Sequence, residues 1–75
     1  MNKDSMTSSI LIKINGENKS TPQDSSILNL LDIYKINKDR VVIELNKLIL
    51  EKDKYGSTKL NNNDEIEIVT FVGGG

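Results

Sequence analysis

Apolar residues recur with a period of two near the start of the chain, where isoleucines alternate with other side chains: Ile10, Ile12 and Ile14. Alternating β-branched residues are typical of a half-buried strand, which we predict over residues 10–14. Asn15-Gly16 follows directly and is a strong hairpin signal, because both residues tolerate a positive φ. We therefore expect a short second strand over residues 17–21, ended by Pro22.

The pattern then changes to the period of a helix, with apolar side chains at i, i+3, i+4 and i+7: Ile27, Leu30, Leu31 and Tyr34. Leu28 and Ile33 widen this face. Ser26 is the preferred N-cap, and Asn37 can adopt the left-handed conformation that ends a helix. The segment runs only to about Lys35, shorter than the ~12 residues that an isolated helix needs, so packing on a sheet must hold it.

A third strand is predicted over residues 40–46, because its apolar side chains again alternate: Val41, Ile43 and Leu45 point one way. Asn46-Lys47 makes a turn into a brief fourth strand over residues 48–50. The polar stretch that follows is irregular. Within it Tyr55 is expected to act as an anchor, and Leu60 to return to the core.

The last strand is predicted over residues 65–72, after a turn over residues 61–64. Ile66 and Ile68 share one face, which we expect to pack on the helix. The opposite face carries three other side chains: Glu67, Val69 and Phe71.

This order of elements predicts an α+β fold, a roll in which one helix packs across a mixed sheet of four to five strands. The helix is the crossover that allows a parallel strand pair to form. Residues 10–72 are expected to form the single domain. Residues 1–9 are polar and serine-rich, which indicates a disordered leader, and residues 73–75 are expected to be a flexible glycine tail.

The composition argues against an enzyme. A chain of 75 residues forms one small domain without room for a deep substrate cavity. It has no cysteine, which excludes a disulfide, a thiolate metal site and a cysteine nucleophile. It has no histidine, the commonest general base and metal ligand. We therefore predict no catalytic residues, no metal and no bound cofactor.

Charge and hydropathy exclude two kinds of partner. The formal net charge is -1 with both signs interspersed, so a basic face for nucleic acid is not supported. No apolar run approaches the roughly 20 residues that a membrane span requires, and no signal-peptide pattern opens the chain. We expect a cytoplasmic protein that binds neither nucleic acid nor membrane.

Three consecutive glycines close the chain directly after the last apolar strand: Gly73, Gly74 and Gly75. A tail without Cβ atoms can thread a narrow channel in another protein and present its free carboxylate there. The alternative is a frayed terminus without function.

Four apolar residues are interpreted as a partner-binding surface: Leu11, Val42, Val69 and Phe71. If Ile66 and Ile68 face the helix, Val69 and Phe71 lie on the open face of the sheet, with Leu11 and Val42 beside them. A contiguous group of exposed apolar side chains often marks an interface. The alternative is that the strand bends at its end and Phe71 packs at the rim of the core.

Several segments together resemble the sulfur-carrier branch of the β-grasp (ubiquitin-like) superfamily, and within it the ThiS-like carriers of thiamine biosynthesis: Ile12 to Glu17, Ser26 to Leu31, Val41 to Asn46, and Leu60 to the terminal glycines. Their order, spacing and glycine end carry the resemblance, which covers nearly all of the chain after the leader. Lys47, Glu51-Lys52 and Asn63 depart from the usual pattern in loops. Asn63 replaces a turn glycine, which asparagine can do because it also visits positive φ.

The resemblance implies a carrier rather than an enzyme. A separate ThiF-like enzyme would use ATP to adenylate the carboxylate of Gly75. Sulfur from a cysteine desulfurase or similar donor would then give a thiocarboxylate, which thiazole synthase consumes. Gly73 and Gly74 would thread the partner's active site.

Two alternatives stay open at this point. The small subunit of molybdopterin synthase shares the fold and the tail. A ubiquitin-like interaction module or conjugation tag would bind partners through its surface, with a tail that is incidental or forms an isopeptide bond.

Overall fold

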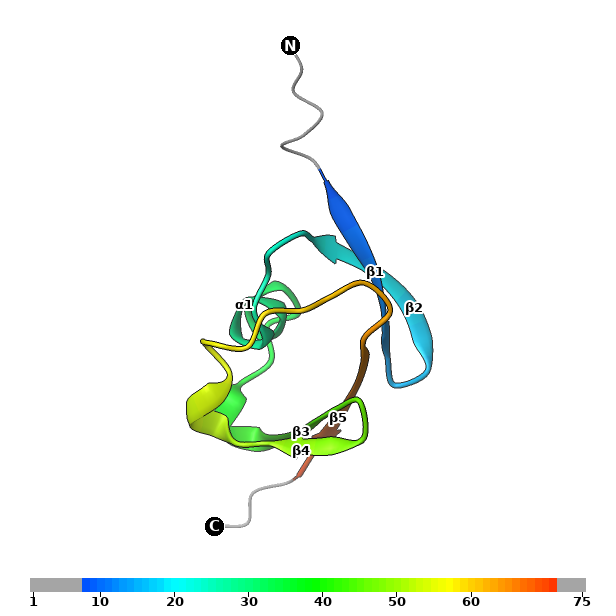
Figure 1. Ribbon diagram of the computed structural model, residues 1–75. Helices are drawn as coiled ribbons and strands as arrows, with labels where there is room; N and C mark the ends of the chain where they lie inside the picture. Colours follow the sequence, from blue (N-terminus) through cyan, green and yellow to red (C-terminus); the bar gives the residue numbers. More distant parts are fainter. Residues whose placement is uncertain (1–7, 72–75) are drawn as a thin grey trace.

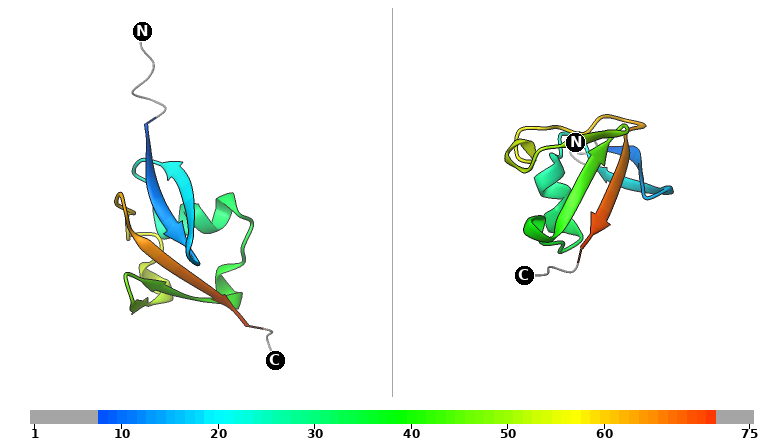
Figure 2. Two further views of the ribbon diagram at one scale, coloured as in Figure 1. Left: turned by 90° about the vertical axis from the view of Figure 1, so that its right-hand side faces the viewer. Right: turned by 90° about the horizontal axis from the view of Figure 1, so that it is seen from below.

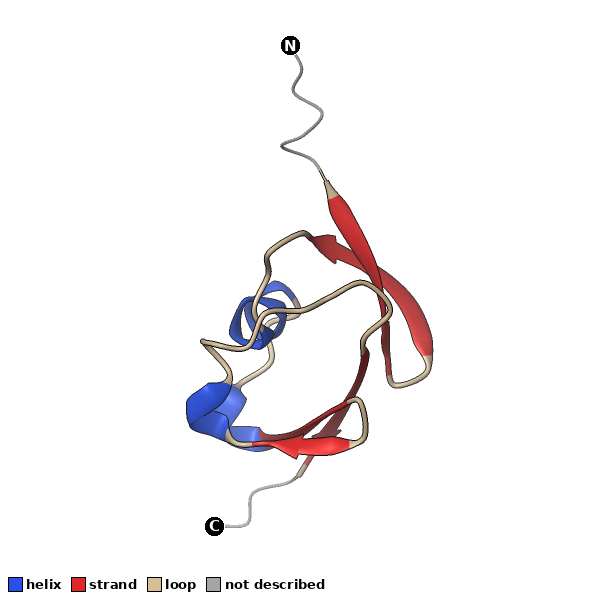
Figure 3. Ribbon diagram, viewed as in Figure 1, coloured by secondary structure: helices blue, strands red, loops and turns tan. Residues whose placement is uncertain are grey.

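The computed structural model describes residues 8–71. Its elements follow the predicted order (Figures 1 and 3), and their bounds are as follows: β1 Ser9–Ile14, β2 Glu17–Pro22, α1 Ile27–Ile33, the 3-10 turn η2 Lys38–Arg40, β3 Val41–Leu45, β4 Leu48–Leu50, the 3-10 turn η3 Lys52–Lys54, and β5 Glu65–Thr70. The strands form one five-stranded sheet in the order β2-β1-β5-β3-β4. The predicted α+β roll with a mixed sheet is confirmed.

The last strand lies in the middle of this sheet. β5 runs parallel to β1, where Lys13 pairs with Glu65 and Ile14 with Ile66, and antiparallel to β3. The two hairpins β1–β2 and β3–β4 flank it on either side (Figure 2). The parallel pair requires a long crossover connection, and the helix lies on that crossover.

Both hairpins close with two-residue turns of left-handed backbone. Asn15 and Gly16 have φ values of 51° and 86°, and Asn46 and Lys47 have 52° and 73°. Such turns match the right-handed twist of the strands that they join. Both predicted turns are therefore confirmed, although Lys47 holds a conformation that disfavours a side chain with a Cβ atom.

The core lies between α1 and the concave face of the sheet (Figures 1 and 2). Among residues 8–71, nine apolar side chains are buried there: Ile12, Ile27, Leu30, Leu31, Val41, Ile43, Tyr55, Leu60 and Ile66. The burial predicted for Tyr55 and Leu60 is confirmed. Full burial of one such aliphatic side chain contributes about 1.5–3 kcal/mol, so a few residues supply most of the stability of this small domain.

The start of α1 is held by its own cap and by the irregular segment after β4. Ser26 Oγ accepts a hydrogen bond from the Asn29 amide at 3.1 Å, and Asn29 Oδ1 accepts one from the Ser26 amide at 3.0 Å. This reciprocal capping box confirms Ser26 as the N-cap. The amides of Ile27 and Leu28 donate to carbonyls of the later segment, those of Thr58 and Tyr55. These bonds satisfy amides that have no partner within the helix.

The end of α1 differs from the prediction. The helix stops at Ile33, and Lys35 rather than Asn37 takes the left-handed conformation, with φ 58°. The Ile36 amide donates to the Leu31 carbonyl and the Lys35 amide to that of Asp32, which is a Schellman motif. Ile36 is partly buried against the core, so the chain turns back toward the core directly after Lys35.

Three other features also differ from the prediction: the start of β1, the end of β2 and the exposure of two side chains at the end of α1. β1 begins at Ser9, inside the segment expected to be a leader, and residues 1–7 lie outside the described residues. β2 includes Pro22 at its end, which an edge strand tolerates. Ile33 and Tyr34, which the predicted helix face included, are exposed. Among residues 8–71, no helix is long and apolar enough to cross a membrane.

Replacing the cap should weaken the fold by a defined amount. Ser26→Ala removes the acceptor for the Asn29 amide and should lower the free energy of unfolding by about 1 kcal/mol. Urea unfolding followed by circular dichroism measures this. Ser20→Ala on the exposed side of β2 is the control and should change stability by less than about 0.5 kcal/mol. Equal effects from the two variants would show that the cap does not stabilise the domain.

Candidate functional site

The chain leaves the sheet at the end of β5, which is where the glycine tail begins. The last described hydrogen bond joins the Phe71 amide to the Arg40 carbonyl at 3.0 Å. The predicted tail residues Gly73, Gly74 and Gly75 lie outside the described residues, as does Val72 at the predicted end of the strand. The structure therefore defines the surroundings of the exit, with an open sheet face on one side and a cavity on the other.

On the open face, apolar side chains lie around the exit. Val42 and Val69 are direct cross-strand partners, exposed by 40% and 55%, and Phe71 follows two residues later with 45% exposed. Ile49 of β4 pairs with Glu44, next to Val42 on the same face, and is 70% exposed. Diagonal neighbours of this kind are close enough for their side chains to meet. We call these four residues the apolar patch: Val42, Ile49, Val69 and Phe71.

Ile49 was missed by the sequence analysis, although a signal for it was present. Leu48, Ile49 and Leu50 are all apolar, so alternation could not reveal which of them faced outward. The two-residue turn before them determines the register, because it places Ile49 opposite Glu44.

Leu11 does not belong to the patch. It is exposed, but the pairing of Lys13 with Glu65 places Leu11 at the level of residue 63, at the beginning of β5. Val69 lies six residues further along, about 20 Å at 3.3 Å per residue. The main chain of Leu11 instead bonds to the 61–64 turn, through Asn62 Oδ1 at 2.8 Å and the Asn63 amide at 2.6 Å. The predicted grouping of Leu11 with Val42, Val69 and Phe71 is therefore wrong.

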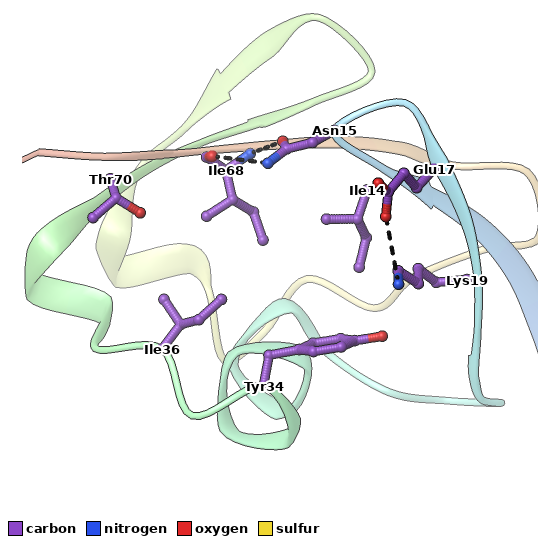
Figure 4. A pocket seen from close by; sticks show the side chains of 8 residues that line it. All are labelled: Ile14, Asn15, Glu17, Lys19, Tyr34, Ile36, Ile68 and Thr70. Carbon is purple, nitrogen blue, oxygen red and sulfur yellow. Dashed lines mark hydrogen bonds and ion pairs between the residues drawn. The ribbon is translucent and has the colours of Figure 1, made fainter.

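On the inner side of the exit lies an open cavity of about 440 Å³ (Figure 4). Eight residues line it: Ile14, Asn15, Glu17, Lys19, Tyr34, Ile36, Ile68 and Thr70. It exists because α1 ends at Ile33 and does not reach the second half of β5, which leaves Ile68 only half-buried. Glu17 and Lys19 pair at 3.5 Å on its rim. Its walls combine the apolar side chains of Ile14, Ile36 and Ile68 with polar and charged groups.

Two turn asparagines bind β5 from opposite edges. Asn15 Oδ1 accepts from the Ile68 amide at 2.7 Å, and Asn15 Nδ2 donates to the Ile68 carbonyl at 3.3 Å (Figure 4). Asn46 Oδ1 accepts from the Glu65 amide at 2.9 Å, at the other end of the strand. Asn46 Nδ2 also donates to the buried carboxylate of Asp64 at 3.0 Å. Both hairpin turns therefore contribute side chains as well as backbone to the central strand.

The turn before β5 is more ordered than its composition suggested. Asp64 Oδ2 accepts from the Asn61 amide at 2.8 Å, which closes the turn. Asn63 has φ 73°, so the prediction that asparagine stands in for a glycine of positive φ is confirmed. The sequence predicts only a turn at these residues, and the burial of the Asp64 carboxylate was not predicted.

Charged groups elsewhere have a structural role. Lys52 Nζ lies 2.8 Å from Asp39 Oδ1 and joins η3 to η2. This hydrogen bond, together with the lysine charge, lowers the pKa of Asp39, and the same contact raises the pKa of Lys52. Both groups are fully exposed, so solvent screening leaves the pair little effect on stability. Within residues 8–71, no group of three or more acidic side chains is placed to hold a metal ion.

One helix held in the curve of a five-stranded mixed sheet, with the last strand in its centre, defines a β-grasp domain. The model of the ThiS family matches residues 12–75, and the chain belongs to this family. The thiamine biosynthesis protein ThiS from Geobacter metallireducens superposes with a TM-score of 0.76 at 26% identity, over 88% of this chain and 100% of that one.

Relatives of known sequence agree with this membership. The chain is 38% identical over 66 residues to the sulfur carrier protein ThiS of Bacillus subtilis, covering 87% of this chain and 100% of that protein. It is 41% identical over 68 residues to the uncharacterized protein ycf40 of Pyropia yezoensis, covering 91% of this chain and 96% of that one. It is also 33% identical over 64 residues to the thiazole synthase of Magnetococcus marinus, covering 85% of this chain but only 20% of that larger protein.

A lysine should be tolerated in the apolar patch but should destabilise the domain when it replaces a core residue. Val69→Lys places the ammonium group in solvent on the face that carries Glu44 and Glu67, so the free energy of unfolding should change by less than about 0.5 kcal/mol. Ile66→Lys puts the same group where the native side chain is 1% exposed, and an unpaired buried charge should unfold the domain. Thermal unfolding of both variants checks this. A comparable loss from Val69→Lys would place Val69 in the core.

Proposed function

We propose that this protein is a sulfur carrier of thiamine biosynthesis, whose Gly75 carboxylate is adenylated and then converted to a thiocarboxylate. The observation that carries the proposal is the match to the ThiS family, which extends through residue 75 and therefore includes the glycine tail. The protein is a substrate of other enzymes and not itself a catalyst. Lacking cysteine, it cannot carry sulfur as its own persulfide, which leaves the terminus as the carrier group.

The chemistry gives the tail a specific task. A carboxylate is a poor acyl donor, so one of its oxygens first attacks the α-phosphorus of ATP, and pyrophosphate leaves. The resulting acyl adenylate has a good leaving group. Sulfur at the oxidation level of sulfide then attacks the carbonyl carbon, the C–S bond forms, and AMP leaves with the oxygen. A ThiF-like adenylating enzyme would bind the ATP. A cysteine desulfurase or similar donor would supply the sulfur as a persulfide, and a thiol reductant would cleave that persulfide to sulfide, with a disulfide as the other product.

The fold would contribute a rigid base for the tail and a surface beside it. Phe71 is still held by the hydrogen bond from its amide to the carbonyl of Arg40, the residue directly before β3. Gly73 and Gly74 lack Cβ atoms and suit a channel too narrow for side chains. The apolar patch adjoins the exit and would dock the adenylating enzyme. The same tail would later deliver sulfur to thiazole synthase, and the likeness of this chain to part of one such enzyme supports that partner.

The family match favours this function over the small subunit of molybdopterin synthase and over a conjugation tag, because the matching relatives of assigned function belong to thiamine biosynthesis. Bound cofactors are not expected, since ATP would be held by the adenylating enzyme. The cytoplasmic location stays a prediction.

Changes to the length of the tail should abolish adenylation without affecting folding. Deleting Gly74 and Gly75, or adding one alanine after Gly75, should leave the melting temperature unchanged, because glycine has no side chain to pack. Both variants should lose ATP–pyrophosphate exchange with the adenylating enzyme, since a misplacement of about 1 Å can already cost a hundredfold in rate. With sulfur donor added, intact mass should show one sulfur in place of one oxygen on the wild-type chain. Normal exchange by the extended chain would exclude the Gly75 carboxylate from the reaction.

The apolar patch should contribute to binding of the carrier by the adenylating enzyme. Val69→Lys should raise the KM of the adenylating enzyme for the carrier, because a charged group would be buried without a partner on binding. Leu11→Lys is the matched control, since Leu11 is similarly exposed but lies at the other end of the sheet. Steady-state adenylation at varied carrier concentration measures both. An unchanged KM for Val69→Lys, or an equal rise for Leu11→Lys, would contradict docking through the patch.

A further inference from the structure

The second half of β5 has a strand neighbour on only one edge. On the β3 side, pairing continues to Val41 opposite Thr70 and on to the Phe71 amide. On the β1 side, strand pairing ends where Ile14 meets Ile66, because β1 turns away at Asn15. The Asn15 amide still reaches the Ile66 carbonyl at 2.9 Å, and beyond that point no backbone of β1 is available.

The side chain of Asn15 supplies the missing partner. Its amide group presents one acceptor and one donor to the main chain of Ile68, at 2.7 and 3.3 Å, just as a further strand residue would. It therefore extends the β1 edge by one residue, and Figure 4 shows it bonded to the strand at the top of the cavity. The left-handed turn conformation, with φ 51°, directs the side chain back toward β5.

Packing provides little substitute for these bonds. The cavity of about 440 Å³ lies directly under this part of the strand, and Ile68 is only half-buried against it. Without Asn15, β5 would be held there by β3 alone. Two-stranded ribbons twist more than strands that have neighbours on both sides, so the direction in which the chain leaves Phe71 would change.

We propose that Asn15 is a positioning residue for the glycine tail: by pairing with Ile68 it sets the direction in which β5 leaves the sheet, and so the place that the terminal carboxylate reaches in a partner enzyme. The effect on a partner rests on the proposed function, whereas the effect on β5 does not. Asn15 lies on the opposite side of β5 from Val42 and Ile49 of the apolar patch, so its loss should affect the reaction more than docking.

The chain contains a matched control in Asn46. It is also the first residue of a left-handed turn, accepts from a β5 amide through its side chain, and donates its own amide to the Glu65 carbonyl at 2.7 Å. Its bonds hold the beginning of β5, three residues before Ile68. Asn15→Gly and Asn46→Gly each remove a side chain without creating left-handed strain.

The first measurement is amide hydrogen exchange of the free carrier by NMR. Asn15→Gly should accelerate exchange of the Ile68 amide by on the order of tenfold, the loss of one net hydrogen bond. The Val69 amide, which faces β3, should keep its protection relative to global unfolding. Asn46→Gly should accelerate the Glu65 amide and leave that of Ile68 unchanged. Unchanged exchange of Ile68 in Asn15→Gly would overturn the proposal without reference to any enzyme.

The second measurement is adenylation kinetics below the unfolding temperature of each variant. Asn15→Gly should lower kcat by about tenfold or more, with KM within about twofold, because the tail is misdirected after docking. Asn46→Gly should keep both constants near wild type. Asn15→Asp retains the acceptor for the Ile68 amide and should restore part of kcat.

The controls separate two kinds of failure. A wild-type chain that is not adenylated at all would refute the proposed function, and the exchange data would still decide whether Asn15 holds β5. An active wild type with equal kcat for Asn15→Gly would refute the positioning role alone. Equal losses of kcat in Asn15→Gly and Asn46→Gly would also refute it, since the effect would then follow from general destabilisation.

Discussion

The structure depends on hydrogen bonding along both edges of β5. A central strand buries its backbone groups, and each buried N–H or C=O without a partner costs stability. The partners of β5 come from distant parts of the chain: Asn15 and Ile68 are 53 residues apart. The two halves of the sheet are joined only through this last strand. A molecule that lacks β5 has two separate hairpins, so the element that carries the tail is also the element that completes the fold.

This arrangement leaves a short helix to cover a long sheet. The helix α1 has only seven residues, and the Schellman motif at Lys35 turns the chain at its end. The consequences are the cavity under Ile68 and the need for polar bonds at that position. Asn15 therefore supplies polar bonds to β5 near the end where Phe71 leaves the sheet, while Asn46 supplies them at the beginning of the strand.

Local features were predictable from the sequence, whereas register was not. Asn15-Gly16 and the Ser26 cap follow from spacing within a few residues, and both are confirmed. The predicted helix face is buried at Ile27, Leu30 and Leu31 but not at Ile33 and Tyr34. The place of Leu11 depends on how β1 aligns with β5, which no local pattern records. Asn37 has the better propensity for a left-handed residue, yet Lys35 takes that conformation, and the Ile36 amide after it bonds to the Leu31 carbonyl.

In the candidate site, too, some features follow from the local sequence and others depend on contacts between distant segments. Val42, Val69 and Phe71 were predicted as exposed because alternation reports which face a side chain takes. The exposure of Ile49 was not predicted, because its neighbours are equally apolar. The bonds of Asn15 to Ile68 could not be foreseen, because the hairpin signal accounts fully for an asparagine at that position and leaves no sign of a second role.

The parallel pairing of β1 and β5 has a practical consequence for handling this molecule. Because the two strands run in the same direction, Ser9 and Phe71 lie at opposite ends of the sheet, separated by on the order of 30 Å along the strands. An affinity label, fluorophore or surface linker attached ahead of Ser9 would therefore stand clear of the exit. The protein can therefore be immobilised through its amino end without covering Phe71.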